Sequence, residues 1–516
     1  MSEMISLYLG KTSTAYFLEQ VMVILVLLAF GFIVNLCLCR GNMDMPEMLL
    51  AFPTGISLYS LTSFILLVSG SPFNRVSVTG ICILIAAICL FCTFRSGKMA
   101  YMGGSSRKET IIYLITMLCI AVISTSGIIS VSVSNDSLYY YWMYPRALVS
   151  YGFLRPQFDV FLTDVGQTSA TLNTLPFMYG FNEGFGIQTF LGINTLFIAI
   201  YAIYRNAGAR LERKKAYIAT VILSLLLICT QPVLIMFKWI MSNGYFMCFM
   251  FMVVYCAYTF DRKRAADSSV DMRGRVAILG ILMLQMSMLR MEGIMVTLVL
   301  VICFSTLKYR NTELFCAFLL PEFVCALAYS FWVFIVCNVD APYTFLTPEK
   351  ALLQLAAIAA VSVYVMIFRG RRFDPVGKRI KVILPLSIIA ADLVLFLLNK
   401  MLFVENLSAF ARNISNRSGW GLFPMYIIGV YVLLFIVNFK KGEKSGAMTF
   451  WDMCFVCYLL ATLAVCFARE DALRESIGDS GNRVLMQVSL LAFYAGADHL
   501  IGLVDGTGTG PGRSMK

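Results

Sequence analysis

The feature that most constrains this chain is a series of apolar stretches that runs from near its beginning to near its end. A stretch of about 17–25 apolar residues crosses the hydrocarbon core of a bilayer as a helix. The shortest two, 276–289 and 291–307, meet at Arg290, Met291 and Glu292. We expect fifteen membrane-spanning helices, near residues 16–39, 48–69, 76–94, 111–132, 186–204, 216–237, 242–260, 276–289, 291–307, 314–338, 351–368, 381–398, 420–438, 449–467 and 484–503. The sequence therefore predicts an all-α polytopic membrane protein.

Composition excludes the main alternatives to a membrane fold. Hydrophobic residues make up 59% of the chain and charged residues 14%, whereas a soluble domain has about 45–50% and about 25%. Neither a soluble globular fold nor a disordered chain has this balance. The net charge is +12, and the basic residues that cause it stand in short clusters between apolar runs. A nucleic-acid-binding protein gathers its basic residues on one face, so we expect no nucleic-acid partner.

The basic residues also predict the orientation of the chain. Loops on the cytoplasmic side of a membrane protein carry an excess of Lys and Arg. If the N-terminus lies outside, the inner loops hold 28 of the 41 basic residues, and every inner loop between the fifteen spans fits this rule. We therefore predict that residues 133–185 are outside the cytoplasm and that 205–215 and 369–381 are inside it.

Residue types that serve as metal ligands or cofactor sites are poorly placed for those roles. The 16 cysteines lie almost wholly inside apolar runs, where a thiol behaves as a small hydrophobic side chain. Cys454 and Cys457 have the spacing of a ligand pair, but no second pair accompanies them. The only histidine, His499, lies at the inner end of the last predicted span. The inner loops contain no phosphate-binding or dinucleotide-binding glycine motif and no Asp-x-Asp sequence. We therefore expect no cofactor, and a divalent metal stays an open alternative that no motif supports.

The longest connection, residues 133–185, begins with the pattern of a helix that lies at the membrane interface. Asn135-Asp136-Ser137 is a helix start, Tyr139-Tyr140-Tyr141-Trp142 is an aromatic run, and Gly152 is a helix stop. Aromatic rings are favoured at the interface. In the first turn, the helix dipole stabilises an ionised Asp136, which could accept a proton from a sugar hydroxyl. The same residues would also suit a simple N-cap and aromatic belt.

The predicted outer segments contain further charged residues that could bind a substrate. Arginine grips phosphate with a two-pronged set of donors, and Arg290 is the most indicative because its short turn, with Glu292, keeps it near the membrane. The alternative is that these arginines are interfacial anchors and that the loop carboxylates are solvated turn residues. The remaining candidates are Arg146, Arg155, Asp159, Asp164, Arg417, Arg474 and Arg483.

Three segments resemble the integral-membrane glycosyltransferases of the GT-C superfamily, especially bacterial members that use polyprenyl-phosphate sugars. They are N-D-S-L-Y-Y…P-R-A-L…G at 135–152, M-L-R-M-E-G at 288–293 and G-D-S-G-N-R-V-L-M-Q at 478–487. The resemblance implies that Asp136 is the catalytic carboxylate. The chain departs from the family because Asp136 follows the fourth span instead of the first. Asn135 also stands where metal-using relatives have a second carboxylate.

The resemblance implies four modules along the chain. Residues 1–107 would be added N-terminal helices, 108–310 a GT-C-like catalytic module with the outer loop 133–185, 311–503 a C-terminal module and 504–516 a flexible cytoplasmic tail. The implied activity is an inverting transfer of a sugar from a polyprenyl-phosphate donor to a glycan, lipid or protein acceptor. The reaction would occur at the outer face of the cell membrane, with membrane lipids around the protein.

Two other functions are compatible with the same sequence. A lipid or solute transporter would use acidic residues inside the spans, for which Glu322, Asp392 and Asp452 are candidates. A polysaccharide polymerase or ligase would share the outer loop and arginines, but its leaving group would be a lipid diphosphate.

Overall fold

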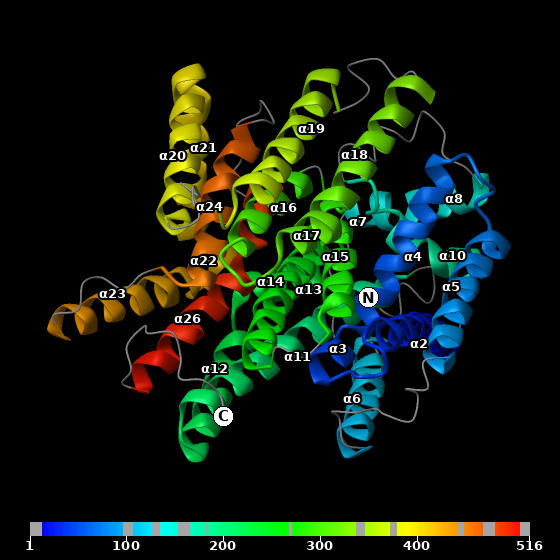
Figure 1. The fold of residues 1–516 in the computed structure, drawn as a ribbon, viewed down its shortest axis with the longest axis horizontal. Helices are drawn as coiled ribbons and strands as arrows, with labels where there is room; N and C mark the ends of the chain where they lie inside the picture. Colours follow the sequence, from blue (N-terminus) through cyan, green and yellow to red (C-terminus); the bar gives the residue numbers. More distant parts are fainter. Residues whose placement is uncertain are drawn as a thin grey trace. The chain divides into compact units, whose positions relative to one another are not determined.

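The computed structural model of the chain is helical, and the residues that it describes contain no β-strand. The described residues are 13–95, 107–125, 135–152, 166–181, 184–267, 271–290, 292–336, 346–371, 379–441, 448–467 and 480–505. Figure 1 shows the helices in chain order. The prediction of an all-α fold is confirmed for this part of the chain.

The helices up to residue 304 are α2 (Ser13–Leu38), α3 (Met45–Leu49), α4 (Ala51–Val68), α5 (Arg75–Arg95), α6 (Arg107–Thr125), α7 (Asn135–Leu138), the π-helix η2 (Tyr139–Met143), α8 (Tyr144–Tyr151), the 3-10 helix η4 (Thr171–Asn173), α10 (Thr174–Met178), α11 (Phe185–Arg210), α12 (Arg213–Ile228), α13 (Gln231–Lys238), α14 (Ser242–Ala266), α15 (Arg273–Met288) and α16 (Gly293–Phe304). The later helices are α17 (Asn311–Leu314), η5 (Phe315–Leu319), α18 (Leu320–Phe331), η6 (Trp332–Val336), α19 (Pro348–Val363), η7 (Tyr364–Phe368), α20 (Ile380–Leu398), α21 (Lys400–Ser415), α22 (Arg417–Trp420), α23 (Phe423–Lys441), α24 (Phe450–Phe467), α25 (Ser480–Met486) and α26 (Ser489–Val504).

Among the described residues, eleven helices are long and apolar enough to cross a membrane. The count becomes twelve if α12 and α13, which meet at a bend of 58°, form one span. The predicted number of fifteen is therefore not confirmed. The predicted spans 276–289 and 291–307 correspond to α15 and α16, which have 16 and 12 residues. Both are shorter than the roughly 20 residues that a full crossing takes.

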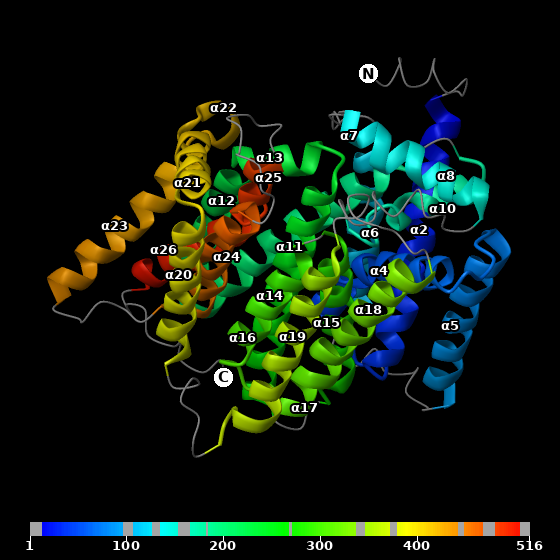
Figure 2. The same cartoon turned by 90° about the horizontal axis from the view of Figure 1, so that it is seen from above.

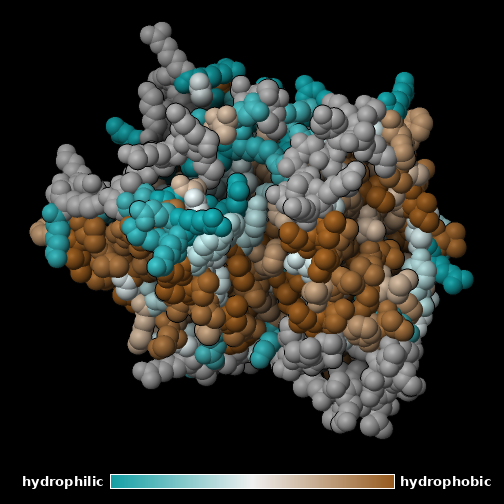
Figure 3. Space-filling model, turned by 90° about the horizontal axis from the view of Figure 1, so that it is seen from below, coloured by the Kyte–Doolittle hydropathy of each residue, from teal (hydrophilic) through white to brown (hydrophobic). Residues whose placement is uncertain are grey.

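Many large apolar side chains point away from the protein, as expected of a multi-pass membrane protein. On α5, Ile83 and Leu84 are 62% and 58% exposed, and on α20 Leu397 is 74% exposed. Figure 3 shows one face of the molecule on which hydrophobic residues occupy a large area. Contact of such side chains with lipid tails costs no free energy, whereas contact with water does.

The chain divides into two compact units. The first comprises Met1–Thr195, Lys238–Leu298 and Tyr309–Ile367, and the second comprises Leu196–Phe237, Val299–Lys308 and Phe368–Lys516. These units interleave along the sequence, and the module boundaries predicted at residues 107 and 310 stay predictions.

In the first unit, α2 and α4 pack at very short range because each places a glycine at the contact (Figure 1). A Cβ atom added at Gly31 would lie 1.7 Å from the Ala51 carbonyl oxygen, and one added at Gly55 would lie 1.9 Å from the Leu27 carbonyl oxygen. Small residues let membrane helices approach until their backbones touch, which maximises van der Waals contact. Both positions therefore require glycine.

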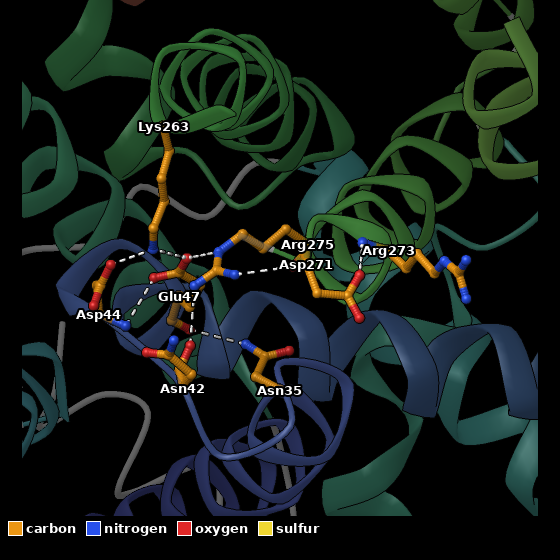
Figure 4. A network of polar contacts seen from close by, with 8 residues as sticks. All are labelled: Asn35, Asn42, Asp44, Glu47, Lys263, Asp271, Arg273 and Arg275. Carbon is orange, nitrogen blue, oxygen red and sulfur yellow. Dashed lines mark hydrogen bonds and ion pairs between the residues drawn. The ribbon is translucent and has the colours of Figure 1, made fainter. Parts of the chain in front are cut away.

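A buried ionic network joins α3 and the turn before it to α14 and α15 (Figure 4). The side chain of Glu47 is 1% exposed and pairs with Arg275, which is 2% exposed. Lys263 on α14 lies 3.2 Å from the same carboxylate and also pairs with Asp44. Arg275 donates a further hydrogen bond of 3.0 Å to the Asn42 carbonyl oxygen. Each buried charge therefore has an opposite charge and a backbone or side-chain partner, which buried ions require.

Cys39 lies beside this network and is buried. Burial, together with the nearby Glu47 carboxylate, raises the pKa of the Cys39 thiol to about 12. This thiol therefore stays protonated at neutral pH and is a poor nucleophile, in keeping with the prediction that cysteines here act as small hydrophobic side chains.

We predict that Arg275→Met strongly destabilises the protein. The substitution leaves the Glu47 carboxylate buried with one of its two cations removed, and breaking a buried pair costs about 3–5 kcal/mol. Thermal unfolding in detergent micelles measures the loss. Adding Glu47→Met should recover most of it, because Lys263 then keeps Asp44 as its partner.

Lys215→Met is the matched control. Lys215 pairs with Glu212 at 3.4 Å, but the two side chains are 59% and 79% exposed, and exposed pairs contribute at most about 1 kcal/mol. Equal unfolding temperatures for Arg275→Met and Lys215→Met would contradict the role given to the network.

Candidate functional site

The first part of the long loop forms the helix that the sequence predicts. α7, η2 and α8 run without a break from Asn135 to Tyr151. Gly152 ends the helix with φ at 71°, and its N–H donates to the Leu148 carbonyl oxygen at 2.9 Å. This left-handed conformation is the usual reason for glycine at a helix end. Asp136 thus lies in the first turn, but the side chains of Asn135 and Asp136 fall outside the described part of the structure.

One side of this helix packs against other helices of the first unit, and its other side is exposed. Figure 2 shows α7, α8 and α10 lying together near the N-terminal end of α2. Tyr141 is buried, and its ring centre lies 6.2 Å from that of Tyr245, close to the start of α14. The Phe73 N–H donates to the Gly152 carbonyl oxygen at 2.9 Å and fixes the far end. Tyr139 and Met143 are exposed, as expected of a helix at an interface.

Arg290, Glu292, Ser242 and Asn243 form a nearly buried polar group, the Arg290 cluster. The Arg290 guanidinium pairs with the Glu292 carboxylate and donates to the Ser242 hydroxyl at 2.7 Å and to the Asn243 Oδ1 at 2.9 Å. The Arg290 side chain is 11% exposed, and the Glu292 side chain is 2% exposed. The cluster joins the turn between α15 and α16 to the first residues of α14.

The conformation of this turn explains the M-L-R-M-E-G sequence. The Gly293 N–H donates to the Arg290 carbonyl oxygen at 2.9 Å, which closes the turn. A Cβ atom at residue 293 would lie 1.9 Å from the Ser287 carbonyl oxygen, so only glycine fits there. The chain reverses tightly enough for the Arg290 side chain to reach the Glu292 carboxylate.

The second described part of the long loop, residues 166–181, docks directly on this turn. Gly166 has φ at +121°, and a Cβ atom there would lie 2.1 Å from the Leu289 carbonyl oxygen. The Thr168 N–H donates to the Met288 carbonyl oxygen at 2.9 Å, and Gln285 donates to the Thr168 hydroxyl at 3.1 Å. Both described parts of the loop thus contact elements that carry the Arg290 cluster.

The side-chain amides of Asn243 and Asn173 each have a buried N–H donor with no hydrogen-bond partner among the described residues. Arginine can only donate hydrogen bonds, so Asn243 must turn Oδ1 toward Arg290, and its Nδ2 then faces away with no partner. Asn173 accepts from the Tyr245 hydroxyl at 3.1 Å, and its Nδ2 is likewise unpartnered. A buried unpaired donor costs about 1–3 kcal/mol. Of the two, only the Asn243 amide contacts Arg290, and a guanidinium with an amide donor beside it is suited to binding an anion such as phosphate.

Of the other candidates in the long loop, only Arg146 lies within the described residues. Arg146 is exposed, and its guanidinium carbon lies 5.6 Å from the centre of the Trp142 ring, which fits an interfacial anchor. Arg155, Asp159, Asp164 and Arg474 fall outside the described residues, so their roles stay predictions.

The second unit holds the other two arginines of the predicted site. Arg483 is half-buried on α25, and Arg417 begins α22, although the side chain of Arg417 is not described. The Trp420 Nε1 donates to the Asn482 Oδ1 at 2.9 Å and joins the two helices. We predict that at least one of Arg290, Arg417, Arg474 and Arg483 lies within a few Å of Asp136, whose side chain falls outside the described part of the structure.

The acidic residues proposed for a transport pathway fall into two kinds. Asp452 is fully engaged, because it pairs with His499 at 2.8 Å and accepts from the Tyr431 hydroxyl at 2.5 Å. Glu322 and Asp392 are buried, and each has one carboxylate oxygen without a hydrogen-bond partner in the described part of the chain. These two are the intramembrane acids that a transporter would use.

No group of three or more His, Cys, Asp or Glu side chains within the described ranges is placed to hold a metal ion. The thiol of Cys303 on α16 does lie beside Cys454 and Cys457 on α24. Sequence reasoning missed this neighbour because Cys303 is far away in the chain.

Sequence reasoning also missed Ser242, Asn243 and Asn173 as members of the site. A polar Ser-Asn pair at the start of an apolar helix is a signal that was present, since Ser242 and Asn243 open α14. No pattern in the sequence distinguishes Asn173 from other loop residues.

The chain matches no family model, no curated protein and no solved structure. What can be concluded about function therefore comes from its own residues.

We predict that Gly166→Ala releases the loop from the turn. A Cβ atom would collide with the Leu289 backbone, and φ at +121° is open essentially to glycine alone. Hydrogen exchange of residues 166–181 should rise, with a loss of stability of about 3 kcal/mol or more from the clash and the strained backbone.

Gly180→Ala is the control in the same segment. Gly180 also has positive φ, at +75°, but a Cβ atom there meets nothing within 4 Å, so only the backbone penalty of about 1–2 kcal/mol applies. If both variants exchange alike, Gly166 does not hold the loop on the turn.

Proposed function

We propose that this protein is an inverting glycosyltransferase that transfers a sugar from a polyprenyl-phosphate donor to an acceptor at the outer face of the membrane. The observation that carries the proposal is the Arg290 cluster, a nearly buried guanidinium in contact with Asn243, whose own amide donor has no partner among the described residues. The two described parts of the long loop contact the elements that form it. A lipid-linked phosphate is the anion that a membrane-boundary site of this kind would meet.

The reaction would divide between two groups of the chain. The acceptor hydroxyl attacks the anomeric carbon from the face opposite the phosphate, and Asp136 takes the hydroxyl proton. The bond between the anomeric carbon and the phosphate oxygen breaks, and its electron pair leaves with the polyprenyl phosphate. Arg290, with the Asn243 amide beside it, stabilises the charge that develops on that oxygen. No nucleotide takes part, because the donor is already activated.

We predict that Asp136→Asn abolishes most of the transfer activity while the fold is kept. Asparagine stabilises a helix start about as well as aspartate, but it cannot accept the proton. Turnover should fall by about 10²- to 10⁴-fold, the usual range for loss of a general base. Release of polyprenyl phosphate in proteoliposomes, from polyprenyl-phosphate hexose and pentose donors, measures turnover without knowledge of the acceptor product.

Glu349→Gln is the matched control, because Glu349 is an exposed carboxylate in the first turn of α19. It should leave turnover unchanged. A folded Asp136→Asn protein that releases polyprenyl phosphate at the wild-type rate would remove Asp136 from the mechanism.

We predict that Arg290→Lys lowers kcat/KM by about 10²- to 10³-fold, the usual effect of removing one donor to a developing charge. Lysine keeps the positive charge and can still pair with Glu292, but it loses the planar fork. The control is Arg264→Lys. Arg264 donates two hydrogen bonds of 2.7 and 2.8 Å to the Glu313 carboxylate. Arg264→Lys should therefore lower the stability of the protein and leave the activity per folded molecule unchanged. Equal activity of both variants would exclude Arg290 from phosphate binding.

The same assay separates the alternative functions. A polymerase or ligase would release polyprenyl diphosphate from a diphosphate-linked donor and leave the monophosphate donor intact. A transporter would move the lipid across the vesicle without cleaving it, and the buried, incompletely bonded Glu322 carboxylate favours Glu322→Gln as the variant that stops it.

A further inference from the structure

A cavity of about 400 Å³ lies between α2, α4, α5 and the end of the 166–181 segment. Its walls include Met22 and Phe30 on α2, Cys82 and Ala86 on α5, and Leu175 on the loop segment. No charged side chain lines it. Because an apolar cavity of this kind is not filled by ordered water, its occupant must itself be apolar.

Hydroxyl groups at the loop side of the cavity are already paired with one another. Tyr179 and Thr79 share a hydrogen bond of 2.7 Å, and Tyr59 and Thr174 share one of 2.8 Å. These hydroxyls are therefore satisfied without a ligand, and they pin the loop segment to α5 and α4. A polar ligand would have to break these bonds, whereas a hydrocarbon chain would leave them intact.

The surroundings of the cavity point to the bilayer as the source of its occupant. α2, α4 and α5 are each long and apolar enough to cross a membrane. On α5, the side chains next to those that line the cavity are exposed and apolar, including Leu84 and Ile88. In a membrane, lipid chains lie directly against this surface. The volume lies within the range of about 300–1,000 Å³ that small-molecule sites occupy.

We propose that α2, α4 and α5 hold one hydrocarbon chain of a membrane lipid in this cavity, beneath the loop segment. The site does not depend on the transfer reaction proposed above. Contacts of the loop segment connect it to the turn that carries Arg290. Tyr59 lines the cavity, the next residue Ser60 bonds to Thr171 at 2.7 Å, and the Thr168 N–H reaches Met288 in the Arg290 turn.

Photo-cross-linking in proteoliposomes tests the proposal. One arm uses a phospholipid and the other a polyprenyl phosphate, each with a diazirine on its hydrocarbon chain, and mass spectrometry maps the labelled peptides. We expect labels on the cavity-lining residues of α2 and α5. Ala86→Phe fills the cavity and should reduce this labelling about tenfold, equivalent to about 1.4 kcal/mol of binding free energy.

Ala87→Phe is the control, because Ala87 is exposed on α5 and does not line the cavity. Met22→Trp narrows the cavity from α2 and replaces Ala86→Phe if that variant does not fold.

The probe that labels the cavity residues, phospholipid or polyprenyl phosphate, identifies the occupant as an acyl or a polyprenyl chain. Labels spread evenly around α5, or labelling that neither cavity variant reduces, would overturn the proposal. Both outcomes are independent of any sugar transfer.

Discussion

The buried ion pair between Glu47 and Arg275 is the interaction on which the first unit most depends. These residues are 228 positions apart in the chain. The pair holds α3 against the start of α15, and Lys263 adds a contact from the end of α14. α14 and α15 pack on each other, and their opposite ends carry Ser242, Asn243 and Arg290. A helix of 25 residues, such as α14, is about 37 Å long, so the ion pair and the Arg290 cluster fix the two ends of the same helix pair.

The glycines complete this arrangement by bringing backbones into contact where side chains would keep them apart. Gly293 allows the turn that presents Arg290, and Gly166 allows the loop to dock on that turn. α4 then connects the loop to the apolar cavity, because Tyr59 and Ser60 bond to threonines of the loop. This polar site and this apolar cavity, joined by one loop, are the features on which we base the proposal of a lipid substrate with a charged head group.

The local features of the site could be predicted from sequence because they depend on neighbouring residues. The helix at 135–152 follows from its polar start and Gly152, and the M-L-R-M-E-G turn follows from its spacing between two apolar runs. The count of fifteen spans is not confirmed because apolar length alone does not distinguish a full crossing from short helices such as α15 and α16. Glu47 with Arg275, and Cys303 with Cys454, could not be predicted. Each joins residues that are distant in sequence, and only the packing of the helices brings them together.

We propose that the Arg290 cluster is the place where a lipid phosphate binds. The most direct measurement is an electron cryo-microscopy structure of the protein in lipid nanodiscs with added polyprenyl phosphate. We expect density for the phosphate with an oxygen about 2.7–2.9 Å from the Arg290 guanidinium, the distance of a charge-assisted hydrogen bond, and a second oxygen facing the Asn243 amide. Phosphate density at the other end of α14 and α15, against Lys263 and Arg275, with no ligand at Arg290, would contradict the account.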